Sequence, residues 1–114
     1  RKVRYFNFYY LKNKDGDFAV RQRPRNGFWG GLWEIPNEEV EQLSWTHQKS
    51  RPNAIYRGEL KHVFTHFDMM IHVFEGNSQE NEWAAPARMI PSEAIDDLAF
   101  SKAVLKIFVK IGLL

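Results

Sequence analysis

Apolar and polar positions alternate along the first quarter of the chain in the way that a β-hairpin requires. A dense run of aromatic and aliphatic residues at 5–11 predicts a strand that is buried on both faces. The turn signal Asp15-Gly16 follows, and residues 18–23 then alternate with a period of two. Two such runs joined by a short turn containing glycine predict a hairpin.

Three more strands are predicted in the second half of the chain. They lie at 55–64, 67–74 and 83–90, the last being a short edge strand that Pro86 interrupts. Thr65 and His66 join the first two of these strands. Residues 76–82 are polar and are predicted as a loop.

Helix signals are fewer and define the remaining elements. Residues 24–36 hold three glycines and two prolines, which predicts a loop, and Asn37 is predicted to cap a short helix with two glutamates directly after it. Further helices are predicted from Pro91-Ser92 and from Ser101 to Gly112. The order strand, strand, loop, helix, three strands, helix predicts a single α+β domain over residues 1–114, with helices packed on one mixed sheet.

Composition narrows the class of protein. Of the 114 residues, 44% are hydrophobic and 15% aromatic, enough to bury a core and to exclude a disordered chain. The chain contains no cysteine, which excludes a disulfide scaffold, a thiol nucleophile and a zinc or iron–sulfur site held by cysteines of this chain. No apolar run approaches the length of a membrane span, and the first residues do not have a signal-peptide layout. We therefore expect a soluble, intracellular protein with no membrane partner.

Charge is distributed in blocks although the formal net charge is only +2. Residues 1–25 carry a net +6, from eight basic and two acidic side chains; residues 26–48 carry −4 and residues 74–97 carry −5. These blocks form either a positive face that steers a phosphate backbone or ordinary surface charge that folding intermixes. Likewise, a stripe of lysines at 102, 106 and 110 on the last helix is either a solvated face or a phosphate-binding surface.

No catalytic group of residues stands out from the sequence. His62 and His66 are four residues apart, but the period-two pattern around them predicts a strand, in which the two imidazoles would be about 13 Å apart. No metal site is therefore predicted. Phosphate-binding glycine loops and the G-x-S-x-G nucleophile motif are also absent from the sequence.

The segment Phe28–Pro36, FWGGLWEIP, follows the predicted second strand and resembles the corresponding segment of the Nudix superfamily. Trp33 and Ile35 are expected to fill the core there. The resemblance does not extend to the catalytic Nudix box: Glu38 occupies the position of its glycine, Ser44 that of its first glutamate, and residues 52–57 that of its R-E-U-x-E-E segment. Those glutamates hold Mg²⁺ through oxygen ligands. The resemblance thus implies the fold, a mixed β-sheet between helices (an α/β/α sandwich), without the hydrolase.

A second segment, residues 60–67 with sequence LKHVFTHF, is similar to the C-terminal domain of the adenine-specific DNA glycosylases, the MutY family. Arg4-Tyr5-Phe6, Trp83 and residues 98–102 support the same resemblance. That domain is Nudix-like and lacks the catalytic box, and its Phe-Ser-His motif contacts 8-oxoguanine opposite adenine. The resemblance implies that Phe64, Thr65 and His66 bind the DNA lesion, with threonine in place of serine.

The family resemblance also implies partners. The chain would be one domain of a larger adenine DNA glycosylase, binding double-stranded DNA that holds an 8-oxoguanine:adenine mispair. Adenine excision would take place in a preceding helical domain with an iron–sulfur cluster, so that this domain holds no cofactor and is non-catalytic. The localisation implied is intracellular and DNA-associated, in a bacterial cytoplasm.

Oxidised guanine carries a donor at N7 and a carbonyl acceptor at C8. A hydroxyl oxygen at Thr65 can accept from N7–H while a loop amide donates to the C8 oxygen. Two alternatives remain open: an active Nudix-type nucleotide pyrophosphohydrolase, and a protein-interaction module on an inactive Nudix fold that uses the aromatic loop at Phe28-Trp29.

Overall fold

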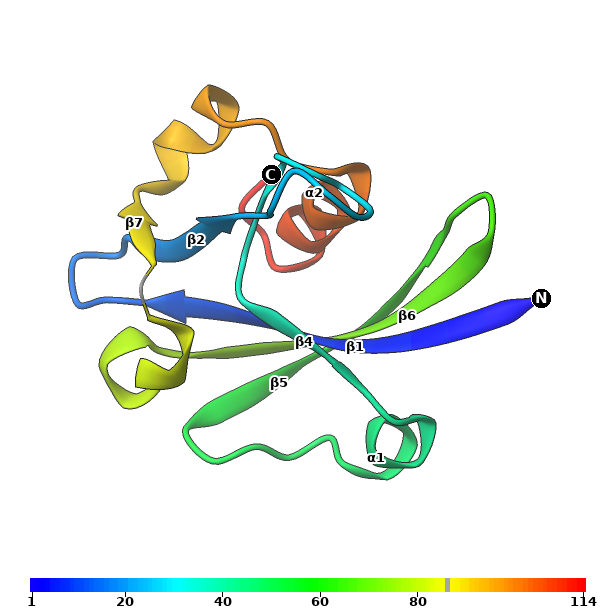
Figure 1. The fold of residues 1–114 in the computed structure, drawn as a ribbon. Helices are drawn as coiled ribbons and strands as arrows, with labels where there is room; N and C mark the ends of the chain where they lie inside the picture. The colour runs from blue at the N-terminus through cyan, green and yellow to red at the C-terminus, as the bar shows by residue number, and fades with distance from the viewer. Residues whose placement is uncertain (86) are drawn as a thin grey trace.

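A mixed, seven-stranded sheet forms the centre of the computed structural model, which describes residues 1–85 and 87–114 (Figure 1). Five strands follow the order β3-β2-β1-β6-β5, while β4 pairs with β1 and β7 pairs with β2. Their bounds are β1 Lys2–Lys12, β2 Phe18–Gln22, β3 Trp33–Glu34, β4 Asn37–Val40, β5 Ala54–Val63, β6 Phe67–Asn77 and β7 Arg88–Ile90.

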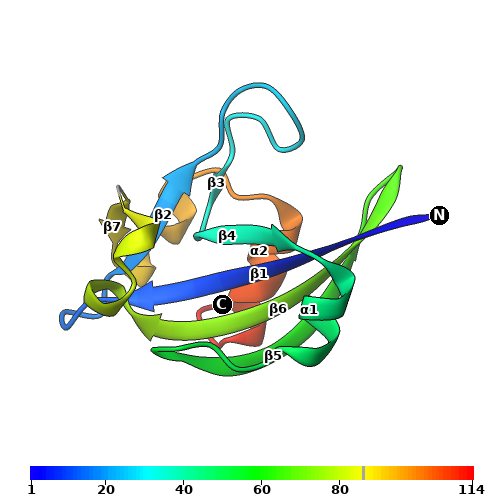
Figure 2. The ribbon, with the colours of Figure 1, turned by 60° about the horizontal axis from the view of Figure 1, so that its bottom comes forward.

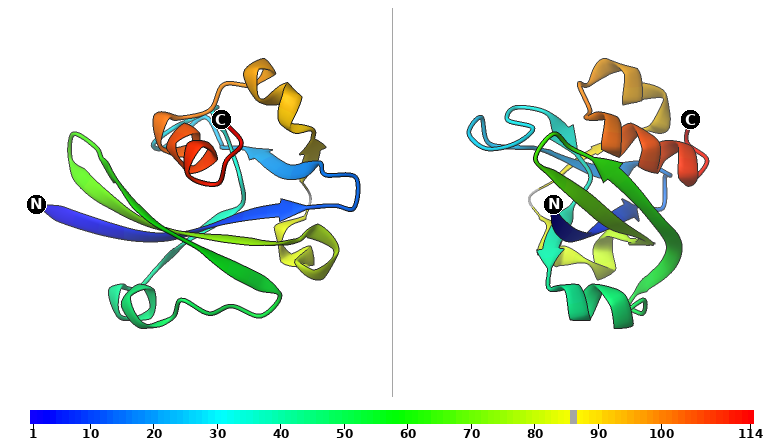
Figure 3. Two further views of the ribbon diagram at one scale, coloured as in Figure 1. Left: turned by 180° about the vertical axis from the view of Figure 1, so that it is seen from behind. Right: turned by 90° about the vertical axis from the view of Figure 1, so that its right-hand side faces the viewer.

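Two α-helices cover opposite faces of this sheet (Figure 3). They are α1 at Gln42–His47 and α2 at Lys102–Lys110, and three short 3-10 helices lie at η1 Ser78–Glu80, η2 Glu82–Ala84 and η3 Ser92–Asp97. Trp45 of α1 packs on His72 of β6, whereas Phe108 of α2 packs against Phe18 of β2. The predicted mixed sheet between helices is confirmed.

The parallel strands β1 and β6 form the centre of the sheet. Their register runs without interruption from Lys2↔Phe67 to Lys12↔Asn77. Because alternate residues of a strand point to opposite faces, Phe6 and Phe8 of β1 join Ile71 of β6 on the face that α2 covers. These side chains are buried and form the main core together with the inner side of α2.

Several predicted elements agree with the structure. Strands occupy 5–11, 18–22, 55–63 and 67–74, and the turn between β5 and β6 contains Thr65 and His66. The side-chain oxygen of Ser101 accepts a hydrogen bond of 3.2 Å from the amide of Val104, so that it caps α2 as predicted. Trp33, predicted as a core residue, is half-buried against the core, and its amide donates to the carbonyl of Ala99 at 2.8 Å.

The helix predicted from Asn37 is wrong. Residues Asn37–Val40 form β4, which pairs antiparallel with β1 from Tyr5↔Val40 to Phe8↔Asn37 and lies beside it in Figure 2. Pairing with the open edge of β1 outweighs the local capping preference, and the Asn37 side chain donates to the carbonyl of Ile35 instead. The helix begins only at Gln42.

The edge strand predicted at 83–90 is too long. β7 contains only Arg88–Ile90, while Trp83 belongs to η2 and the predicted break at Pro86 lies outside the described residues. The loop predicted at 76–82 contains η1, whose cap is the Asn77 side chain accepting from the amide of Gln79 at 2.7 Å. Short local hydrogen bonds of this kind give no periodic pattern for a sequence reading to detect.

The charge blocks are intermixed by folding. Five basic side chains of residues 1–25 form ion pairs with carboxylates from other parts of the chain: Arg1 with Asp68, Arg4 with Glu39, Lys12 with Glu75, and both Arg21 and Arg23 with Glu34. Glu34 is almost fully buried, so its two arginines compensate a charge that is removed from water. No helix in the described part of the chain is long and apolar enough to cross a membrane.

Candidate nucleic-acid interface

The turn between β5 and β6, residues 64–67, brings the three predicted lesion-binding residues together at one end of the sheet. The amide of Phe64 donates to the carbonyl of Phe67 at 2.8 Å, which closes a hairpin with a two-residue tip. Thr65 and His66 form that tip and are exposed, whereas Phe64 is half-buried. The three residues therefore share one hydrogen-bonded turn but have different surroundings.

Among the described residues, the hydroxyl and N–H groups at the tip of this 64–67 turn are open, while the carbonyls of Phe64, Thr65 and Phe67 accept hydrogen bonds. Within residues 1–85 and 87–114, neither the Thr65 hydroxyl nor the amides of Thr65 and His66 have a hydrogen-bond partner. On the other side of the turn, the Arg1 guanidinium donates to the carbonyls of Phe64, Thr65 and Phe67, the last two at 3.2 and 3.3 Å. An incoming group thus meets a hydroxyl and free N–H groups.

Arg1 is held in place by Asp68, the second residue of β6. Its Nε lies 2.7 Å from a carboxylate oxygen of Asp68, and the Lys61 ammonium approaches the other oxygen at 3.5 Å. The hydrogen bond from Arg1, with the charges of Arg1 and Lys61, lowers the pKa of Asp68. Asp68 is therefore ionised at neutral pH and neutralised by two cations.

Aromatic rings support the turn from the face that α2 covers. Phe64 stacks on Phe67 with ring centroids 4.5 Å apart and planes 18° apart. Trp29, from the loop between β2 and β3, lies 5.0 Å from the Phe64 ring, and Phe28 lies 5.9 Å from it. Phe28 and Trp29 are half-buried in this cluster, so they do not form the free aromatic loop on which the interaction-module alternative relied.

His62 connects the aromatic cluster to α2. Its ring meets Phe64 edge-on at 5.0 Å, and its Nδ1 lies 3.1 Å from the Lys106 ammonium. Burial, together with the charges of Lys106 and Lys102, lowers the pKa of His62. The neutral imidazole therefore accepts a hydrogen bond from Lys106, which is a structural role and not that of a metal ligand.

Two lysines near the turn are not neutralised by carboxylates. Among the described residues, Lys102 and Lys106, whose charges act on His62, have no carboxylate oxygen within 4.0 Å. The lysine stripe of α2 is also not purely solvated, since Lys106 reaches His62 and the Lys110 side chain lies against Gly58. Free cations beside an exposed hairpin favour contact with a phosphate backbone.

Sequence reasoning missed Arg1, Trp29 and His62 as neighbours of the turn. For His62 a signal existed, because residues two apart in a strand lie on the same face and Phe64 follows two positions later. For Trp29 the sequence gives no such signal: its contact with Phe64 arises from the return path of the loop between β2 and β3.

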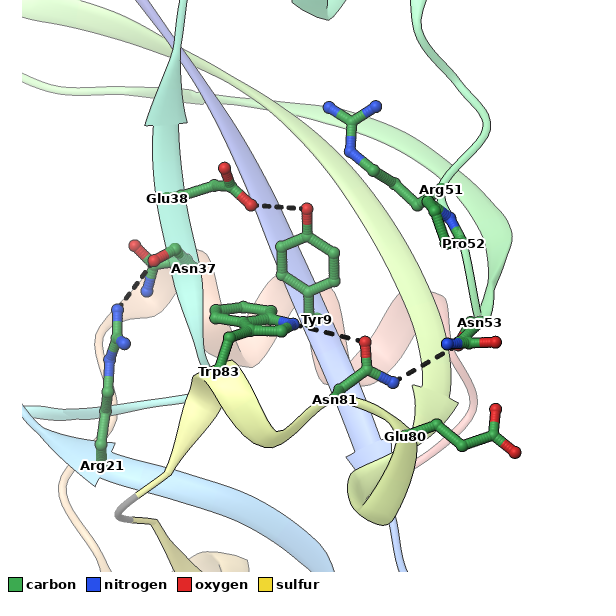
Figure 4. A pocket seen from close by; sticks show the side chains of 10 residues that line it. All are labelled: Tyr9, Arg21, Asn37, Glu38, Arg51, Pro52, Asn53, Glu80, Asn81 and Trp83. Atoms are coloured by element: carbon green, nitrogen blue, oxygen red, sulfur yellow. Dashed lines mark hydrogen bonds between the residues drawn. The ribbon is translucent and has the colours of Figure 1, made fainter.

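A groove on the opposite face of the sheet is the second feature that could bind a ligand (Figure 4). Its volume is about 660 Å³, and its lining comprises Tyr9, Arg21, Asn37, Glu38, Arg51, Pro52, Asn53, Glu80, Asn81 and Trp83. Trp83, 50% exposed, meets Tyr9 edge-on at 4.9 Å, and the Tyr9 hydroxyl donates to Glu38 at 2.7 Å. Burial and this hydrogen bond raise the pKa of Tyr9 to about 12. Tyr9 is therefore a neutral donor and not a base.

Two carboxylates that follow the FWGGLWEIP segment, those of Glu38 and Glu39, are engaged in the fold. Glu38 accepts from Tyr9, and Glu39 forms a two-pronged pair with Arg4 at 2.8 and 2.6 Å, which lowers the pKa of Glu39. In the described part of the chain no three His, Cys, Asp or Glu side chains come together as a set that could hold a metal ion.

This chain belongs to the family of NUDIX domains, whose family model matches residues 7–110. The chain is also similar to adenine DNA glycosylase of Schizosaccharomyces pombe (strain 972 / ATCC 24843), with 33% identity over 79 residues. The match covers 54% of this chain and 17% of the length of that protein.

Solved structures show the same fold. The C-terminal domain of mouse MUTYH, in its complex with human PCNA, superposes with a TM-score of 0.75 at 20% identity, covering 96% of this chain and 87% of that chain. The MutT protein from Methanosarcina mazei Go1 superposes with a TM-score of 0.67 at 16% identity, covering 99% and 94%. The predicted resemblance to the C-terminal domain of the adenine-specific glycosylases is confirmed.

Proposed function

We propose that this chain is the lesion-recognition domain of an adenine-specific DNA glycosylase and that its 64–67 turn binds 8-oxoguanine opposite adenine. The observation that carries the proposal is the exposed tip of the turn, where the Thr65 hydroxyl and two neighbouring N–H groups lack partners within the described chain. The similarity to adenine DNA glycosylase supports the choice of lesion.

The turn has the chemistry that distinguishes 8-oxoguanine from guanine. The Thr65 oxygen accepts from N7–H of the oxidised base, and an amide of Thr65 or His66 donates to the C8 oxygen. Normal guanine has no oxygen at C8 and an acceptor at N7, so the amide loses its acceptor and the hydroxyl keeps a bond to N7 only by turning to donate. One such two-bond contact discriminates by roughly 1–3 kcal/mol.

The remaining parts of the interface bind without reading sequence. Lys102 and Lys106 contact DNA phosphates, as His66 does from the tip of the turn. The glycosylase domain that removes the mispaired adenine, with its iron–sulfur cluster, belongs to another part of the protein. The domain described here has no cysteine to hold such a cluster and supplies no hydrolytic chemistry of its own.

Fluorescence anisotropy with labelled duplexes tests the proposal. The chain is titrated into an 8-oxoguanine:adenine duplex and into a guanine:adenine duplex of the same sequence, at one fixed ionic strength. We expect binding to the oxidised duplex to be about 5- to 150-fold tighter, with equal salt dependence for both because the phosphate contacts are shared. Equal affinity for the two duplexes would overturn the proposal.

A further inference from the structure

Trp29 has a backbone conformation that a bulky side chain rarely adopts. Its φ is +56°, and among the described non-glycine residues only Asn53 shares a positive value. Asparagine tolerates the left-handed region, whereas a large aromatic residue there is a genuine outlier. Such an outlier persists only where its surroundings impose it, and it points to a role for the side chain that it places.

The loop at 24–31 imposes this conformation. The amide of Gly31 donates to the carbonyls of Arg23 and Pro24, both at 3.2 Å, and the amide of Leu32 donates to the carbonyl of Trp29 at 3.0 Å. Gly30 has no room for a Cβ, which would collide with the carbonyl oxygen of Arg25. The loop is therefore closed tightly around Trp29.

The result is an indole ring directed at the 64–67 turn. The Trp29 ring lies 5.0 Å from Phe64 and 6.2 Å from His62. Its neighbour Phe28 extends the same cluster to Phe67 at 6.0 Å. Phe28 is itself held by two cation–π contacts, because the guanidinium of Arg4 lies 5.1 Å from its ring centroid and that of Arg23 lies 4.5 Å from it.

The turn depends on such support. The Phe64–Phe67 backbone bond closes it, Arg1 binds its carbonyls from one side, and the exposed tip contributes no side-chain hydrogen bond within the described residues. Aromatic contacts to Phe64 are what remains on the other side. The tip can present its hydroxyl and N–H at fixed positions only if the turn is supported on both sides.

We propose that Trp29 is a positioning residue for lesion recognition: its ring holds Phe64 and thereby keeps the 64–67 turn closed, with Thr65 in place to contact the base. The consequence for lesion recognition rests on the proposed function, whereas the coupling between Trp29 and the turn does not. The 24–31 loop is thus part of the recognition site without touching the oxidised base.

Amide hydrogen exchange in the DNA-free chain tests the coupling. The Phe64 amide reports closure of the turn, and the Tyr9 amide, which donates to the carbonyl of Pro36 at 2.8 Å, reports global opening. In Trp29→Gly, which relieves the backbone and removes the ring, we expect exchange at Phe64 to rise about tenfold or more relative to Tyr9. Trp29→Phe retains a ring and should stay within about threefold of the parent.

Two further variants make the result decisive. Trp29→Asn keeps a residue that accepts a positive φ but lacks the ring, so it should open the turn as Trp29→Gly does, and it replaces that variant if the latter does not fold. Trp83→Ala is the matched control, because it removes a half-exposed indole from the opposite face and should leave Phe64 exchange unchanged. Unchanged exchange at Phe64 in both ring-deletion variants overturns the coupling.

Duplex binding then tests the consequence. Trp29→Gly should lose the preference for 8-oxoguanine:adenine over guanine:adenine, and Trp29→Phe should retain it. A turn that opens while the preference persists would overturn the positioning role. A parent chain with no preference at all, but with Phe64 exchange that responds to Trp29, would instead refute the proposed function and leave the coupling intact.

Discussion

His72 and Trp45 stack ring on ring, with centroids 3.7 Å apart and planes only 8° apart. The same histidine bonds through Nε2 to the Trp45 carbonyl at 2.7 Å and through Nδ1 to the Tyr56 hydroxyl at 3.0 Å. Because a carbonyl only accepts, Nε2 must carry the proton, and the neutral ring can then accept from Tyr56 at Nδ1. This arrangement attaches the short helix α1 to the centre of the sheet.

The buried state of His72 predicts how stability depends on pH. Burial is the largest cause of a lowered pKa for His72, and burial likewise lowers the pKa of His62. As pH falls through 6.5, the ordinary value, the unfolded chain takes up protons that the folded chain does not. We therefore expect the free energy of unfolding to decrease from pH 7 toward pH 5, as measured by urea denaturation at each pH.

Two substitutions assign that dependence. His72→Asn and His62→Asn should each flatten the pH profile between 7 and 5, and the double variant should flatten it most. The profile, rather than the absolute stability, is the readout, because each substitution also removes packing. If the free energy of unfolding of the double variant falls with pH as steeply as that of the parent, other groups govern the acid sensitivity.

Replacing Asn7 by an apolar residue is expected to stabilise the fold. The Asn7 side chain is fully buried on β1, between Glu38 and His72 in the strand register, and neither of its polar atoms has a hydrogen-bond partner in the described chain. Replacing an unsatisfied polar group by an apolar one of similar size removes its desolvation cost. Asn7→Val should raise the free energy of unfolding by about 1 kcal/mol.

Asn7→Ala is the size control for this substitution. It removes the same polar atoms but leaves a void, so it should be less stable than Asn7→Val. A loss of stability in Asn7→Val, measured by urea denaturation, would mean that the amide is satisfied by a bound molecule and is not a source of instability.

Replacing Trp33 is expected to lower the stability of the fold without a specific loss of DNA binding. Trp33 packs half-buried against the core, its amide bonds to Ala99, and the Arg88 guanidinium lies 5.6 Å from its ring centroid. Trp33→Ala should lower the free energy of unfolding by about 2–4 kcal/mol, somewhat less than for a fully buried tryptophan. A variant that melts like the parent but no longer binds the duplex would reverse this assignment.

The positions of the carboxylates predict no nucleotide hydrolysis. With Glu38 bonded to Tyr9 and Glu39 to Arg4, we expect purified protein with Mg²⁺ to release no phosphate products from nucleoside triphosphates or diphosphate derivatives above buffer. Turnover that Glu38→Gln or Glu41→Gln abolishes would contradict this and would favour the pyrophosphohydrolase alternative. Turnover that neither substitution changes indicates a contaminant.

The sequence predicts the central part of the fold because strong periodicity survives folding. Residues 55–64 and 67–74 alternate clearly, and they form β5 and β6 with the two-residue tip at Thr65 and His66 between them. Asn37 shows the opposite case: a local capping signal was present, yet a partner strand about thirty residues away determined its conformation.

The surroundings of the turn could be predicted only in part. A sequence motif is enough to select Thr65 and its neighbours as candidate site residues. The support of the turn by Trp29, however, depends on loop closure at Gly31 and on crowding at Gly30. The stack of His72 on Trp45 likewise joins residues from two elements that no periodic pattern relates. Contacts of this kind become visible only when the backbone path is known.

The most direct measurement compares Thr65→Val with Thr65→Ser for discrimination between 8-oxoguanine:adenine and guanine:adenine duplexes. Valine keeps the branched shape and removes the hydroxyl, so folding should hardly change while discrimination falls by roughly 1–2 kcal/mol, the cost of leaving one hydrogen-bond partner unpaired. Serine retains the hydroxyl and should retain the discrimination, and the salt dependence of binding should be unaltered in both variants. An equal loss of affinity for both duplexes in Thr65→Val would contradict the account, because Thr65 would then support the turn without contacting the oxidised base.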